Sequence, residues 1–69
     1  MITLNFINGK AEIKKGRKVI ARVFDRAEFF KGTRYEGVHK QFPFSVEMMG
    51  GMFECVSLDE AITILNKYM

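Results

Sequence analysis

The chain has 69 residues, of which 48% are apolar and nine are aromatic. This composition excludes a disordered segment and the length excludes a second domain, so residues 1–69 are expected to form one small packed domain. A core of this size leaves no room for a deep substrate cleft. We therefore expect a protein that works with its surface and not an enzyme.

Charge is distributed unevenly along the chain. Residues 1–40 contain ten Lys/Arg and four Asp/Glu, a surplus of +6, whereas residues 41–69 contain one Lys and four Asp/Glu, a deficit of −3. The single Cys55 excludes an internal disulfide, which favours a reducing compartment, the cytoplasm. No apolar run approaches the roughly 20 residues that span a bilayer, and the strand-like pattern directly after Met1 indicates no signal peptide.

The first third of the chain predicts a three-stranded antiparallel meander. Alternating apolar side chains over residues 2–6 indicate a first strand with one buried face. Asn8 and Gly9 are a strong hairpin signal, because a two-residue type I′ turn needs positive φ at both positions. This turn would pair Ile7 with Lys10.

A second turn is expected at residues 14–16. A three-residue loop with its glycine in the left-handed region pairs Glu12 with Lys18, which sets opposite charges across the strands. This register also keeps three apolar residues of the next strand on one face: Val19, Ala21 and Val23. An even-numbered loop is the alternative, and it would place Ala11 opposite Arg22.

Residues 25–32 predict a short middle helix of about two turns, with a strand as the alternative. Asp25 would cap this helix, Glu28 would complete its capping box, and Gly32 would end it. Residues 33–41 are expected to form a loop or a short edge strand.

A second hairpin is expected over residues 42–56, with its turn at Gly50 and Gly51. That turn would set Glu47 directly opposite Glu54, a like-charge pair that a cation from the neighbouring strand would relieve.

Residues 58–68 predict the C-terminal helix, because Ser57 and Glu60 form a capping box before it. Apolar side chains follow with helical spacing: Leu58, Ala61, Ile62, Leu65 and Met69. Together these elements predict an α+β fold. A mostly antiparallel sheet of about five strands, the N-terminal meander plus the second hairpin, would be covered on one face by this helix.

Six cations around the second turn form the main candidate site: Lys10, Lys14, Lys15, Arg17, Lys18 and Arg22. On one face of two strands they would form a basic ribbon that follows a phosphate backbone or an acidic protein surface. The alternative without a ligand is a charged strand edge that prevents sheet-to-sheet aggregation.

A second candidate is a contact patch of exposed aromatic and methionine side chains with a cation: Arg34, Tyr35, Met49 and Met52. Such residues are typical of protein contact surfaces. The alternative is that the methionines pack beneath the helix or the loop at residues 33–41.

Catalytic and metal-binding constellations are not recognisable. His39 and Cys55 are single copies, no Cys/His spacing fits zinc, and no glycine-rich phosphate loop precedes a helix. We therefore expect no catalytic residue, no metal and no cofactor.

Residues 34–65 resemble in part the DNA-binding domains of plant ethylene-response factors and integrase amino-terminal arms, in which three strands precede a helix. The matching residues are Tyr35, Gly37, Val38, Val46, Glu47, Phe53, Ser57, Glu60 and Ala61. The resemblance implies a sheet in the major groove, with arginine and tryptophan on its face. This chain has no Trp, and Glu36, His39 and Glu54 stand where cations or small residues would be expected.

From these features we expect a small non-enzymatic protein that occupies a surface of a larger protein or nucleoprotein partner. Inhibitor and accessory proteins of phages and mobile elements are of this kind. A nucleic-acid-binding module that uses the ribbon of residues 10–22 is the alternative, and no membrane contact is expected. Sheet addition near residues 42–48 would allow a homodimer.

Overall fold

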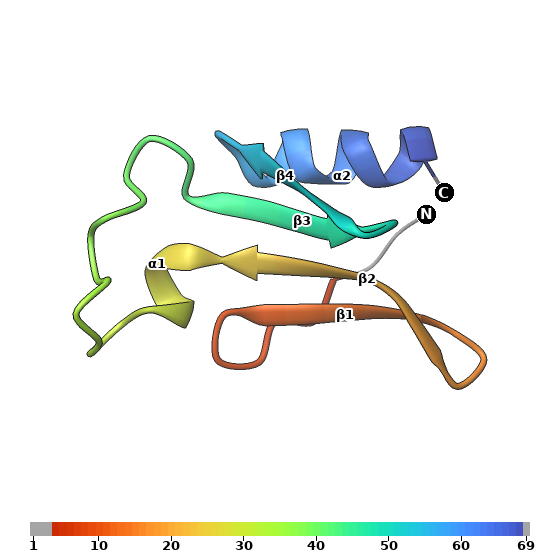
Figure 1. Cartoon of the computed structure of the whole chain (residues 1–69), viewed down its shortest axis with the longest axis horizontal. Helices are drawn as coiled ribbons and strands as arrows, with labels where there is room; N and C mark the ends of the chain where they lie inside the picture. The colour runs from red at the N-terminus through yellow and green to blue at the C-terminus, as the bar shows by residue number, and fades with distance from the viewer. Residues whose placement is uncertain (1–3, 69) are drawn as a thin grey trace.

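The computed structural model describes residues 4–68. Its elements in chain order are β1 (Lys10–Lys15), β2 (Lys18–Asp25), α1 (Arg26–Phe29), β3 (Phe44–Met48), β4 (Gly51–Cys55) and α2 (Leu58–Tyr68) (Figure 1). Neighbouring strands are antiparallel and follow one another in the sheet as they do in the chain, β1-β2-β3-β4. The α+β class, the antiparallel sheet and the C-terminal helix are confirmed, with four strands in the described residues instead of about five.

The core lies between α2 and one face of the sheet. Its buried residues are Ala11, Ala21, Val23, Val46, Met48, Cys55, Ala61 and Leu65. The opposite face, called the open face below, carries two rows of side chains that run across all four strands. One row is Glu12, Arg22, Glu47 and Met52, and the other is Lys10, Phe24, Ser45 and Glu54.

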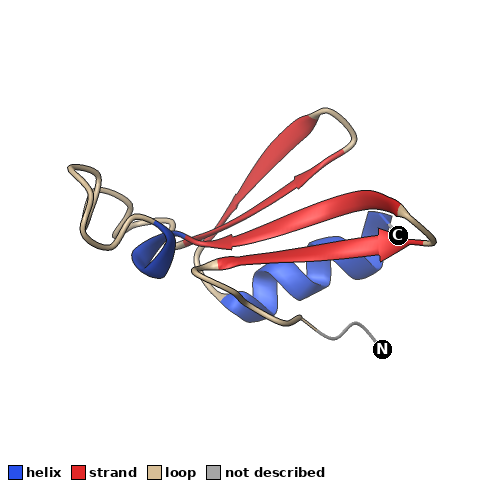
Figure 2. Cartoon of the chain, turned by 90° about the horizontal axis from the view of Figure 1, so that it is seen from below, coloured by secondary structure: helices blue, strands red, loops and turns tan. Residues whose placement is uncertain are grey.

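The predicted first strand is not formed in residues 4–6, while residues 2 and 3 lie outside the described part of the chain. The turn itself is as predicted: Asn8 and Gly9 have φ of 54° and 81°, and Ile7 and Lys10 exchange backbone hydrogen bonds of 2.9 and 3.2 Å. Beyond this single bridge, the segment lies on the side of the sheet that carries α2 (Figure 2), where Leu4 and Phe6 pack against the core. Burial of these two side chains therefore replaces pairing along β1.

The predicted three-residue loop between β1 and β2 is wrong. Lys15 pairs with Lys18 across a two-residue turn, and a bulge then leaves Ile20 without a partner on β1. The bulge restores the alternation that a two-residue turn alone would spoil, so Ala11 pairs with Val23 and not with Arg22. Ala21 and Val23 therefore keep their predicted place on the core face despite the wrong loop length. Val19, which pairs with Lys14 on the other side of the bulge, does not.

The middle of the chain contains one helical turn, α1, shorter than the two turns expected. Asp25 caps it, because its side chain accepts a hydrogen bond of 3.4 Å from the backbone N–H of Glu28. Residues 30–43 form no strand. Residues 34–65 therefore contain two strands before α2, and not the three that the resemblance to ethylene-response factors implies.

The β3–β4 turn is made by Met49 and Gly50, with φ of 54° and 74°, and not by the two glycines. The pairing is therefore shifted by two residues, which leaves every side chain on its predicted face. Glu47 now lies opposite Met52, so the like-charge pair with Glu54 is avoided. Since β3 pairs on both sides, it offers no free edge for the sheet addition expected near residues 42–48.

The C-terminal helix α2 has the predicted bounds and the predicted cap. The backbone N–H of Glu60 donates to the Ser57 hydroxyl at 3.2 Å, and the Glu60 carboxylate accepts from the backbone N–H of Val56 at 3.4 Å. Ala61 and Leu65 are its buried residues. Within residues 4–68, neither helix has the length and apolar content that a bilayer crossing requires.

Candidate macromolecule-binding surface

Two hairpin turns lie at the same end of the sheet, because β2 leads away from one and β3 leads back to the other (Figure 1). The β1–β2 turn carries four cations, which we call the basic tip: Lys14, Lys15, Arg17 and Lys18. The β3–β4 turn carries Met49, with Met52 close behind it on β4. The two hairpins diverge toward these turns (Figure 2), so the tips are separate projections.

All four cations of the basic tip are exposed. Lys15 and Lys18 face each other directly across the strands, an arrangement that destabilises a hairpin through repulsion. No ion pair among residues 4–68 involves any cation of the tip. The tip is therefore a cluster of positive charge that the described chain does not neutralise.

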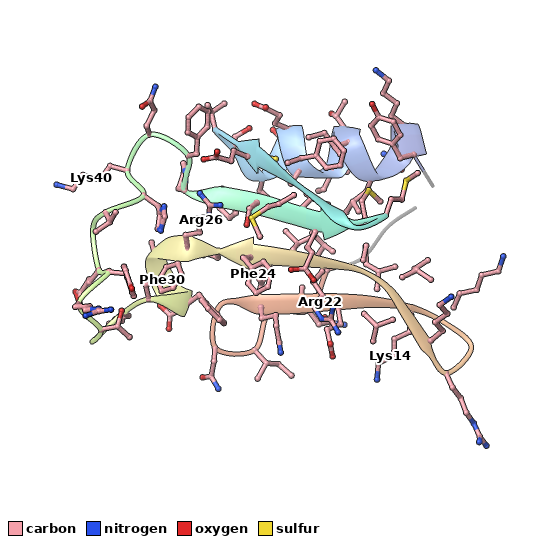
Figure 3. All side chains as sticks on the ribbon, in the orientation of Figure 1. Lys14, Arg22, Phe24, Arg26, Phe30 and Lys40 are labelled. Atoms are coloured by element: carbon pink, nitrogen blue, oxygen red, sulfur yellow. The ribbon has the colours of Figure 1, made fainter. Side chains whose placement is uncertain are left out.

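The other two ribbon cations are placed differently. Arg22 lies in the middle of the open face, where it forms ion pairs of 3.3 Å with Glu12 and 3.1 Å with Glu47 (Figure 3). Lys10 is half-buried at the far end of β1. Arg22 therefore serves as an internal counter-charge for two carboxylates.

The predicted row of cations on one face is not formed. Because Lys18 pairs with Lys15, and neighbouring residues of a strand alternate, Lys14 and Lys18 point to opposite faces of the hairpin. The structure thus brings together four of the six predicted cations, around a turn and not along a ribbon.

The β3–β4 side of this end carries exposed methionines. Met49 and Met52 are 81% and 53% exposed, so the core placement left open from the sequence does not apply to them. Between the diverging hairpins lies a shallow recess of about 500 Å³, whose walls include Val19, Ile20 and both methionines. This recess lies beside the basic tip, and Arg22 and Glu47 also line it. The end of the sheet therefore combines exposed methionines, a recess of mixed polarity and a cluster of cations.

Arg34 and Tyr35 lie at the other end of the molecule from Met49, in the loop that follows α1 (Figure 1). The Arg34 guanidinium lies 5.1 Å from the centroid of the Tyr35 ring, and Tyr35 is 45% exposed. Residues 34–35 and Met49 therefore belong to two different surfaces.

Sequence reasoning missed Arg26, which joins α1, the loop at residues 30–43 and β4 on the open face. Its side chain is only 10% exposed, and its Nη1 lies 3.3 Å from a Glu54 carboxylate oxygen. The same nitrogen donates to the backbone carbonyl of Phe42 at 3.4 Å and lies 3.4 Å from Nδ1 of His39. These partners are 13 to 28 residues away in the chain, so no local pattern could have indicated this role.

Cys55 and His39 do not form a dyad, because Cys55 is in the core and His39 lies beside Arg26 on the open side of the sheet. Burial raises the pKa of the Cys55 thiol, and the nearby Glu60 carboxylate raises it further, whereas Arg26 acts to lower it. The thiol is therefore protonated at neutral pH. Over residues 4–68 there is no cluster of three or more His, Cys, Asp or Glu side chains placed to hold a metal ion.

Comparisons with protein families, with curated proteins and with solved structures give no match for this chain.

Proposed function

We propose that this chain is a non-enzymatic binding protein that occupies an acidic surface of a larger macromolecular partner with its basic tip. The observation that carries the proposal is the pair Lys15 and Lys18. They face each other across the hairpin, and neither forms an ion pair with a carboxylate of residues 4–68. A charge cluster that weakens its own hairpin is relieved when an anionic partner covers it.

A protein or nucleoprotein partner is the first candidate, because exposed methionines and an open recess lie beside the basic tip. Exposed Met49 and Met52 supply adaptable apolar contacts at the same end of the sheet. Protein interfaces combine an apolar centre with a charged rim in this way. Inhibition of a cytoplasmic host machine, or an accessory role in it, as in phages and mobile elements, is the form of this function that we propose.

Nucleic acid is the second candidate, supported by the density of cations between residues 14 and 18. The open face argues against a long contact, since Glu12 lies between Lys10 and Lys14 and pairs with Arg22. Contact with a phosphate backbone would therefore involve the tip alone and few phosphates.

The decisive variant is Lys18→Glu, which places a carboxylate opposite Lys15. It removes positive charge from the tip while it replaces a repulsive cross-strand pair by an attractive one, so the folded state should become slightly more stable. Loss of binding in this variant therefore cannot be assigned to unfolding. Lys67→Glu, in the last turn of α2, is the control with the same change in net charge outside the tip.

Affinity capture from a host lysate with the wild-type chain and both variants tests the first candidate. Proteins retained by the wild type and by Lys67→Glu, but lost with Lys18→Glu, are the expected partners. Equal retention by all three chains would contradict a role for the basic tip.

Gel mobility shifts with duplex and single-stranded DNA and RNA over a salt series test the second candidate. Nucleic-acid binding is excluded if no shift occurs at low salt.

A further inference from the structure

An apolar pocket of about 280 Å³ lies on the open face, at the opposite end from the two hairpin tips. Its walls include the rings of Phe24, Phe29, Phe30 and His39 and the side chain of Met52. Successive rings are in contact, with centroid separations of 5.1 Å for Phe24–Phe29, 5.0 Å for Phe29–Phe30 and 5.1 Å for Phe30–His39. A cavity of about 150 Å³ already accepts benzene, so this pocket has the size for one large side chain.

The exposed lining of the pocket is almost entirely apolar, and the one charged group in its wall is already engaged. Arg26, in the pocket wall, makes its contacts with Glu54, His39 and the Phe42 carbonyl, and its Nη2 lies 3.4 Å from the Met52 sulfur. The ion pair with Glu54 offsets its charge. A nucleobase placed here would lose hydrogen bonds to water without replacement, whereas an apolar side chain loses none.

A second recess of about 420 Å³ adjoins the pocket, because Arg26 and His39 belong to the walls of both. Lys31 and Lys40 line this recess, and neither forms an ion pair within residues 4–68. The Lys40 side chain extends outward from the loop (Figure 3). Glu36 is its acidic residue, and the carboxylate accepts a backbone hydrogen bond of 2.9 Å within its own loop. The recess is therefore positively charged next to an uncharged apolar pocket.

We infer that the apolar pocket and this basic recess together bind an acidic protein segment. One aromatic or branched aliphatic side chain of the segment enters the pocket between the phenylalanine rings, and carboxylates next to it meet Lys31 and Lys40. Charge complementarity selects an acidic segment, and the apolar lining of the pocket selects an apolar side chain over a base. The site shares Met52 with the recess beside the tip but none of the four cations of the basic tip, so charge changes in the tip and in the basic recess test the two proposals separately.

The test is an NMR titration of the ¹⁵N-labelled full chain with the blocked peptide acetyl-Glu-Phe-Asp-Asp-amide. Saturable amide shifts are expected at Phe29, Phe30, Ser45 and Met52, with a dissociation constant of about 1 mM or tighter. Replacement of the peptide's phenylalanine by alanine should weaken binding about tenfold or more, since the buried ring supplies most of the apolar contact. Replacement of its acidic residues by lysine should abolish binding.

Two variants of the chain separate this site from the tip. Lys40→Glu should weaken binding of the acidic peptide severalfold, and Lys18→Glu, with the same change in net charge, should leave it unchanged. The inference is overturned if no saturable shift occurs up to about 10 mM peptide, or if the alanine peptide binds equally well. Shifts of the same four amides by oligo-dT, with no response to the acidic peptide, would overturn it in favour of a base pocket.

Discussion

Gly9 and Gly16 are both left-handed turn glycines, yet their replacement by alanine should change the free energy of unfolding by very different amounts. Gly16 has a φ of 64°, and a Cβ built there would meet no atom within 4 Å. Gly16→Ala should therefore cost only the left-handed conformation, about 1 kcal/mol. In a domain of this size, that corresponds to a fall in Tm of about 4–8 °C.

Gly9 has a similar φ of 81°, but it is buried against the last residue of α1, Phe29. A Cβ on Gly9 would overlap the backbone nitrogen of Phe29 and lie 2.6 Å from its Cα and 2.9 Å from the carbonyl oxygen of Asp25. The backbone must move apart, which also disturbs the 2.8 Å hydrogen bond from the Asp25 N–H to the Gly9 carbonyl. Strain, overpacking and this hydrogen bond together amount to about 3–5 kcal/mol.

That cost is comparable with the whole stability expected of a 69-residue domain, about 3–5 kcal/mol. Gly9→Ala should therefore be largely unfolded at 25 °C, while Gly16→Ala gives a cooperative transition with a lower midpoint. Urea titrations followed by circular dichroism measure both. If the two variants differ by less than about 1 kcal/mol, the close approach of the Asn8–Gly9 turn to α1 is not present in solution.

Three further predictions concern single positions. Met49→Asn should raise the free energy of unfolding by about 0.5–1 kcal/mol in a urea titration. Asparagine tolerates a φ of 54°, and little packing is lost because the methionine is 81% exposed. A lower free energy of unfolding would indicate a turn at the two glycines instead. Ser57→Ala should lower the free energy of unfolding by about 1 kcal/mol, because the hydrogen bond that caps α2 is lost. An unchanged thermal midpoint would show that Ser57 does not cap the helix. Burial raises the pKa of the Cys55 thiol in the folded chain above its ordinary value of 9.0. As the pH rises above 9.0, the thiol ionises first in the unfolded chain, so the free energy of unfolding falls, whereas below that pH it is retained. Cys55→Ala should remove this alkaline loss, and the same alkaline slope in both chains would refute the assignment.

The candidate site was predictable only in part. The cations near the β1–β2 turn are visible in the sequence, and so are exposed methionines near the other turn. Their arrangement was not, because the turn length and the bulge at Ile20 decide which faces Lys14 and Lys18 occupy. The pocket on the open face was not predictable at all, since Phe24, Phe30 and His39 come from three segments that only the packed chain brings together.

Local signals by themselves determined the bounds of α2, the turn at Asn8 and Gly9, and which strand positions face the core, except at Val19, where the bulge reverses the face. Each depends on residues within a few positions of one another: a cap and its acidic partner, a dipeptide that tolerates positive φ, or an alternation of period two. Only the tertiary structure decided which strand residues pair. A shift of two residues in β3–β4 leaves every side chain on the same face, so alternation cannot distinguish the two registers. The observed β3–β4 register avoids repulsion between Glu47 and Glu54. The β2–β3 register sets Arg22 opposite Glu47, and this pairing joins residues far apart in the chain.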